Sequence, residues 1–201
     1  MSEAGMAFPG KDKLVAAVSA VAHGNCEHTI GQRLQSVLTD LVHDPEIQLP
    51  EMLFENTTDQ YLRRLLHHDQ KLDYTIMAMS WGPGQATPIH DHNGMWCVEA
   101  VWRGEIEVVQ YELLADHGDR VQMRRHQTIA AEIGSAGSLI PPHEYHTIAN
   151  PSATDTAVTL HIYQGALDQC CLFHPMPTET SDSSGVGWYR RETKQLALDA
   201  A

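Results

Sequence analysis

The sequence is poor in positive charge and has no long apolar run. It holds 13 Lys and Arg against 26 Asp and Glu among 201 residues, which gives a formal net charge of -13. Binding to nucleic acid or to an anionic membrane needs clustered cations, so we expect neither partner. The most apolar stretch, residues 14–22, is far shorter than the roughly 20 residues needed to cross a bilayer. We therefore expect a soluble protein.

Cysteine is also scarce. The four cysteines are too few for a disulfide framework at this length, and their spacing is not that of a zinc ribbon. Residues 1–13 lack the charged segment and long apolar core of a secretory signal. We expect reduced thiols in a cytoplasmic protein.

Apolar residues recur at helical spacing in residues 14–21 and 30–41, which predicts a small helical cap within residues 1–58. From Tyr61 onward, short β-branched and aromatic runs are separated by Gly, Pro, Asn and Asp. The predicted strands cover residues 61–67, 73–81, 95–103, 105–113, 122–130, 138–140, 147–150 and 157–164, although residues 61–66 could also be helical. Many short strands without helices between them indicate an antiparallel barrel or sandwich within residues 59–175.

The C-terminal residues 176–201 are expected to form an arm that packs on the barrel. Residues 178–186 are rich in Ser, Thr and Gly, which predicts a loop or an extended segment. Residues 188–198 are expected to form a terminal helix.

Histidine is as frequent as Lys and Arg together, with 13 copies. His90 and His92 stand out because they follow a Pro-punctuated approach and lie two residues apart. In an extended segment both side chains share one face and can reach one ion. An H-x-H pair alone is a weak signal, and a packed or surface pair is an equally common reading.

A second motif downstream strengthens the first. Together the two motifs resemble those of the cupin superfamily, G-x5-H-x-H followed by a metal-binding Glu and a Gly, and then P-x4-H-x3-N. The matching residues are Gly84, His90, His92, position 97 and Gly104, then Pro141, His146 and Asn150. The resemblance implies a mainly β fold, the cupin double-stranded β-helix or jelly-roll-like barrel, here with an N-terminal helical cap.

The position that supplies a Glu ligand in typical cupins is Cys97 here, while Glu99 lies off the pattern. A cysteine in that slot resembles the thiol dioxygenases, and the likeness to the cysteine dioxygenase family extends from about residue 61 to 170. Within it, Tyr61 and Arg63 resemble a substrate clamp. Thr159, His161 and Tyr163 resemble a hydroxyl–imidazole–phenol relay.

The resemblance implies Fe(II) held by His90, His92 and His146, with zinc as the rival metal for the same ligands. Three neutral imidazoles would leave the full 2+ charge on the ion, which favours an anionic thiolate. Arg63 and Tyr61 would bind the substrate. The implied catalytic residues are Tyr163, His161, Thr159 and Cys97, and a thioether bond between Cys97 and Tyr163 is also implied.

The sequence thus predicts an oxidoreductase that converts L-cysteine to cysteine sulfinate with O2. The alternatives are a dioxygenase of 3-mercaptopropionate or mercaptosuccinate, and a non-catalytic cupin that binds a metal or a small acid. Because the resembling family is often monomeric, we expect a monomer or a weak homo-oligomer. The other expected partners are the small thiol and O2.

Overall fold

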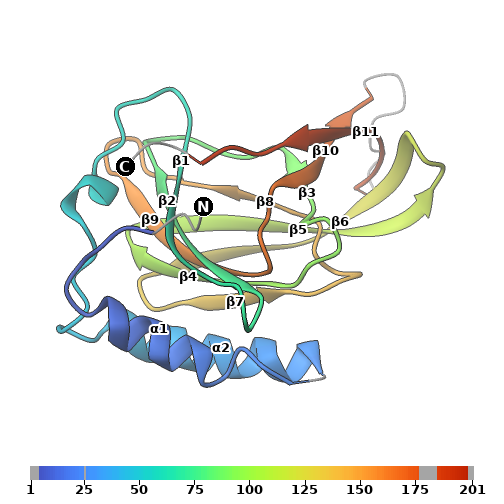
Figure 1. Ribbon diagram of the computed structural model, residues 1–201. Coiled ribbons are helices and arrows are strands. Elements are labelled where there is room, and N and C mark those ends of the chain that lie inside the picture. Colours follow the sequence, from blue (N-terminus) through green and yellow to red (C-terminus); the bar gives the residue numbers. More distant parts are fainter. Residues whose placement is uncertain (1–4, 25, 177–184, 199–201) are drawn as a thin grey trace.

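The computed structural model describes residues 5–24, 26–176 and 185–198, and it is mainly β (Figure 1). One five-stranded sheet has the order β1-β2-β9-β4-β7, and a second sheet closes on itself in the order β10-β11-β6-β5-β8-β3. The first sheet contains β1 (Leu62–Asp69), β2 (Tyr74–Trp81), β4 (Cys97–Arg103), β7 (Ala136–Leu139) and β9 (Ala157–Gln164). The second contains β3 (Ile89–His90), β5 (Glu105–Asp116), β6 (Arg120–Glu132), β8 (His146–Ala149), β10 (Gln169–Pro175) and β11 (Val186–Gln195).

The two helices predicted near the N-terminus are confirmed as α1 (Lys11–Ser19) and α2 (Glu27–Val42), followed by a short 3₁₀ turn at Glu51–Phe54. In Figure 1 both helices lie along one face of the five-stranded sheet, and α2 contacts β4 and β7. Leu34 and Leu38 of α2 are completely buried in the cluster that also holds Val98 and Leu160 of the sheet. The helices therefore cover the sheet face that points away from the barrel interior.

This covering explains why β2 and β9 are apolar along most of their length instead of alternating. All eight residues of β2 are buried, and so are the first seven of β9. One face of each strand packs under the helices, and the other faces the barrel interior. Strands buried on both faces lose the alternation of apolar and polar residues.

The terminal helix expected over residues 188–198 is wrong. Residues 186–195 form β11, which pairs with both β10 and β6. A polar run such as Tyr189–Gln195 is compatible with a helix by local propensity, but pairing with two distant strands decides its conformation. The loop expected over residues 178–186 lies mostly outside the described residues.

The motif residues Gly104 and Asn150 have structural roles. Gly104 has a φ of +78° between β4 and β5, and a Cβ there would lie 3.0 Å from the Cβ of Ala157. The Asn150 side-chain amide donates hydrogen bonds to the carbonyl oxygens of Trp81, Gly82 and Asp155 at 2.7–3.1 Å. These contacts fix the end of β8 against the end of β2.

Neither α1 nor α2, the α-helices within the described ranges, combines the length and apolarity needed to cross a membrane. The division of the chain into a cap (1–58), a barrel domain (59–175) and an arm (176–201) stays a prediction. The structure does show that β11 is a strand of the closed sheet.

Candidate metal centre

Three histidines from β3, the residues after it and β8 come together. His90 of β3 lies directly opposite His146 of β8 in the antiparallel register, and His92 follows β3 by two residues. Each offers a ring nitrogen, and these nitrogens all lie within 4.8 Å of one another. Three ligand atoms so close together can reach one ion.

Backbone carbonyls set the orientation of two of these rings. His90 Nδ1 lies 3.2 Å from the oxygen of Pro88, and His146 Nδ1 lies 2.8 Å from the oxygen of Glu144. A carbonyl only accepts, so each Nδ1 carries the proton and each Nε2 keeps its lone pair. Histidine ligands in metal sites are commonly held in this way.

Burial also keeps the three rings neutral. Desolvation lowers the pKa of His90, and it lowers the pKa of His92 and His146 well below the ordinary value, because burial disfavours the charged imidazolium. Neutral imidazole is the form that binds a metal. The donor set therefore fits a divalent transition metal held by three nitrogens and no carboxylate.

Tyr61 and Arg63 lie beside this centre. Both line a pocket that also includes His90 and Tyr163. Arg63 is only 5% exposed, and its guanidinium donates to the carbonyl oxygens of Leu167 at 3.2 Å and Ala197 at 3.3 Å. The ring of Tyr61 stacks on Trp81, with the ring centroids 4.7 Å apart.

Two further residues of this pocket were not predicted, because the segment that carries them was expected to be a helix. Lys194 and Leu196 come from β11 and the residue that follows it, and both line the pocket. Lys194 lies opposite Cys170 in the β10–β11 register, and it is exposed. Only the long-range pairing of β11 brings this second cation near Arg63. Nothing in the local sequence marks it.

The three relay candidates lie along β9. Thr159 Oγ1 and His161 Nε2 are 2.7 Å apart, and the indole Nε1 of Trp81 donates to Thr159 Oγ1 at 2.9 Å. His161 and Tyr163 meet as stacked rings, with centroids 5.8 Å apart and an interplanar angle of 13°. The expected order of hydroxyl, imidazole and phenol is present, but the imidazole and the phenol touch by stacking.

Cys97 lies directly opposite Tyr163 in the β4–β9 register, and their side chains are hydrogen-bonded. Desolvation raises the pKa of the Cys97 thiol and of the Tyr163 phenol well above their ordinary values. Both groups are therefore protonated at neutral pH. The structure thus places the two ends of the expected thioether side by side.

One buried acid near the site does not match the cupin motif, and no role was predicted for it from the sequence. Glu99, two residues after Cys97, is 8% exposed, and its Oε2 lies 3.4 Å from His161 Nδ1. Strand alternation from Cys97 could have found it, because residues two apart share a face.

The sequence also carries a family signature over the residues that build this site. Residues 51–175 match the family model for cysteine dioxygenase type I. The chain belongs to the cysteine dioxygenase type I family. The mainly β cupin barrel that the motifs implied is confirmed by this membership together with the strand topology.

The cysteine dioxygenase relatives are distant. The chain is 25% identical over 104 residues to cysteine dioxygenase type 1 of Rattus norvegicus, which covers 50% of this chain and 49% of that protein. It is 28% identical over 120 residues to the protein of the same name from Danio rerio, with 57% of each chain covered. The chain thus spans about half the length of the curated relatives that it matches.

Solved structures similar to this cysteine dioxygenase family member include a protein from Thermus thermophilus. It has a TM-score of 0.45 and 20% identity, and the match covers 60% of this chain and 97% of that one. Another is a cupin superfamily protein from Desulfitobacterium hafniense. Its TM-score is 0.43 and its identity is 16%, with 61% of this chain and 94% of that chain covered.

Proposed function

We propose that this protein is a thiol dioxygenase that converts L-cysteine to cysteine sulfinate, with Fe(II) held by His90, His92 and His146. The observation that supports this proposal most is the group of three neutral imidazoles without a carboxylate, beside a pocket lined by Arg63. When bound, iron would supply the ligation of the thiolate and the activation of O2. The net reaction is RSH + O2 → RSO2⁻ + H⁺, in which both oxygen atoms end on sulfur.

Charge favours a thiol that also carries a carboxylate. Neutral ligands leave the ion's full 2+ charge to attract the substrate sulfur as a thiolate. Arg63 supplies a second positive centre in the pocket, and a guanidinium pairs with a carboxylate through two parallel hydrogen bonds. The pocket therefore suits an anionic thiol although the protein as a whole is acidic.

The other predicted site residues contact the substrate, position its neighbours or form the wall of the pocket. Tyr163 lines the same pocket as Arg63 and its hydroxyl stays protonated, so it can donate a hydrogen bond to the bound substrate. Thr159 and His161 are positioning residues behind it. Tyr61, held against Trp81, closes the pocket wall next to Arg63.

Lys194 supports a second candidate substrate. The described residues that line the pocket include two cations, Arg63 and Lys194, but no Asp or Glu. A thiol with two carboxylates, such as mercaptosuccinate, could pair with both cations. 3-Mercaptopropionate, with one carboxylate and no amine, needs only Arg63.

Oxygen uptake with iron-loaded protein tests the proposal. L-Cysteine, 3-mercaptopropionate and mercaptosuccinate are compared as substrates, and the sulfinate product is identified by mass spectrometry. Metal content is measured on the same samples, and zinc-loaded protein serves as a control. Fast uptake with L-cysteine supports the main proposal, whereas preference for mercaptosuccinate supports the second. Tight thiol binding without uptake would instead indicate a non-catalytic cupin.

We also propose the thioether between Cys97 Sγ and the ring of Tyr163. Its formation removes one hydrogen from the thiol and one from the ring, and O2 accepts both hydrogens with their two electrons and becomes H2O2. Peptide mapping of protein after turnover should find the two peptides joined, with a loss of two hydrogens. Recovery of both peptides only as separate species would contradict this proposal, and Cys97→Ser is the matched control.

A further inference from the structure

A carboxyl group lies in the barrel interior next to His161. Glu99 belongs to β4, on the same face as Cys97, and neighbouring residues of the strand are apolar. Burial raises the pKa of Glu99 to about 7, because desolvation disfavours the carboxylate. A buried acid costs stability unless another group compensates it, so its position calls for a reason.

The hydrogen bonds around Thr159 favour one tautomer of His161. The Trp81 indole can only donate, and it donates to Thr159 Oγ1 at 2.9 Å. The Thr159 hydroxyl then uses its own proton toward His161 Nε2, 2.7 Å away. In this arrangement Nε2 accepts and Nδ1 carries the hydrogen.

That Nδ1–H faces Glu99. The Nδ1 atom lies 3.4 Å from Glu99 Oε2, and it is hydrogen-bonded to Cys97 Sγ at 3.9 Å. Burial lowers the pKa of His161 to about 3, so the ring is neutral and the contact is not an ion pair. Glu99 Oε2 is buried and makes no hydrogen bond within the described residues, and its approach to His161 Nδ1 is a contact at 3.4 Å. The opposite tautomer would turn a ring lone pair toward the carboxylate and would repel it.

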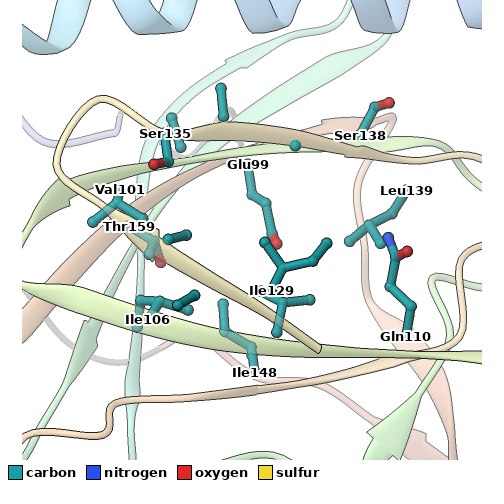
Figure 2. A pocket seen from close by; sticks show the side chains of 16 residues that line it. Glu99, Val101, Ile106, Gln110, Ile129, Ser135, Ser138, Leu139, Ile148 and Thr159 are labelled. Carbon is teal, nitrogen blue, oxygen red and sulfur yellow. The ribbon is translucent and has the colours of Figure 1, made fainter. Parts of the chain in front are cut away.

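Glu99 also lines a pocket that has room for water. In Figure 2 the Glu99 side chain points into this pocket, toward Ile129 and Ile148. Its volume is about 140 Å³, and the exposed residue Ile129 belongs to its lining. Gly137 lies directly opposite Glu99 on β7, and a Cβ there would meet nothing within 4 Å.

We propose that Glu99 is a positioning residue: its carboxylate, hydrated through this pocket, accepts the Nδ1 proton of His161 and holds the ring in one tautomer and orientation. The role in turnover rests on the proposed function. The hydrogen bond itself does not, so it can be tested without any substrate.

The titratable groups that face Glu99 are few. His161 and Tyr163 approach from β9, and Cys97 precedes it on β4. Gly137 faces it from β7, and the residues that β5, β6 and β8 contribute to the pocket are not ionisable. Because burial keeps Cys97 and Tyr163 protonated and His161 neutral, Glu99 is the group in this cluster that titrates near neutral pH.

Nuclear magnetic resonance of the zinc-loaded full chain provides the test, since zinc is diamagnetic. The Nδ1–H resonance of His161, identified by its loss in His161→Gln, should lie far downfield and shift with pH around a midpoint near 7, the pKa of Glu99. In Glu99→Gln the amide oxygen still accepts the hydrogen bond, but it is neutral and therefore a weaker acceptor that does not titrate. The resonance should therefore move upfield and lose its pH dependence. In Glu99→Leu it should move further upfield. Glu107→Gln, which removes an exposed acid on β5, is the matched control and should change nothing.

A resonance that is the same in wild type, Glu99→Gln and Glu99→Leu would overturn the proposal. Gly137→Val gives a second measurement that leaves Glu99 in place. Filling the pocket should displace water and raise the midpoint of the titration, and an unchanged midpoint would contradict the hydration step.

Activity supplies the remaining readout. With iron and the preferred thiol, Glu99→Leu should lower kcat by about 10- to 100-fold at nearly constant KM, a loss of the size seen when the hydrogen-bond partner of a metal-ligating histidine is removed. Glu99→Gln should recover part of the loss. If wild type itself takes up no oxygen, the proposed function fails while the resonance still decides the role of Glu99.

Discussion

The role of Arg63 can be tested by changing the enzyme and the substrate together. In Arg63→Met the side chain keeps a similar length but loses the guanidinium. In a pocket with no Asp or Glu among its described lining residues, the charged hydrogen bonds to a substrate carboxylate should contribute about 1.5–3 kcal/mol. At 1.36 kcal/mol per decade, this corresponds to a fall in kcat/KM for L-cysteine of roughly 10- to 150-fold.

The same substitution also removes the donors to the carbonyl oxygens of Leu167 and Ala197, so lost stability must be separated from lost binding. Cysteamine, which is L-cysteine without its carboxylate, makes this separation. Initial rates of oxygen uptake are measured for both thiols with wild type, Arg63→Met and Arg63→Lys. Thermal denaturation reports the fraction of folded protein in each variant.

The expected result is a large loss with L-cysteine, little change with cysteamine, and an intermediate loss in Arg63→Lys, which keeps the charge but not the planar fork. Equal losses with both thiols would refute the reasoning, because Arg63 would then act only by holding the loop at Leu167 and the C-terminal residues.

Four further outcomes follow from the structure. Lys194→Gln should lower kcat/KM several-fold for mercaptosuccinate and leave it unchanged for L-cysteine, because only the dicarboxylate reaches this exposed residue; equal effects on both would contradict its pairing role. His146→Ala should fail to retain stoichiometric iron on elemental analysis, since it removes one of three ligands. Thr159→Ala should destabilise the protein by about 1–3 kcal/mol in chemical denaturation, because the buried indole of Trp81 loses its acceptor, whereas Thr159→Ser should not. Glu99→Gln should stabilise the protein by up to about 3 kcal/mol above pH 7. The pKa of Glu99 in the folded protein, about 7, lies above the ordinary 4.5, so the wild type loses stability as the pH rises between these two values. The stability gained by the substitution should therefore vanish below pH 4.5.

Local sequence patterns predicted much of the fold. The helical spacing of residues 14–21 and 30–41 predicted α1 and α2, and β-branched runs broken by turn residues predicted most strands. The prediction failed at residues 188–198, whose polar composition fits a helix, because pairing with β10 and β6 outweighs local propensity.

Some residues of the candidate site could likewise be predicted from the sequence, and others could not. Spacing singled out the pair His90 and His92, and resemblance to family motifs implied His146, Arg63 and Tyr163 as further site residues. The family motifs include neither Lys194 nor Glu99, although both line pockets in the folded protein.

The sequence by itself determined the family, the barrel and the three imidazoles, since each depends on short-range order along the chain. Only the tertiary structure decided which charges surround them. β11 brings Lys194 to the pocket through pairing across the barrel, and β4 buries Glu99 beside His161. Desolvation and contacts between distant strands set these properties, and neither is present in the local sequence.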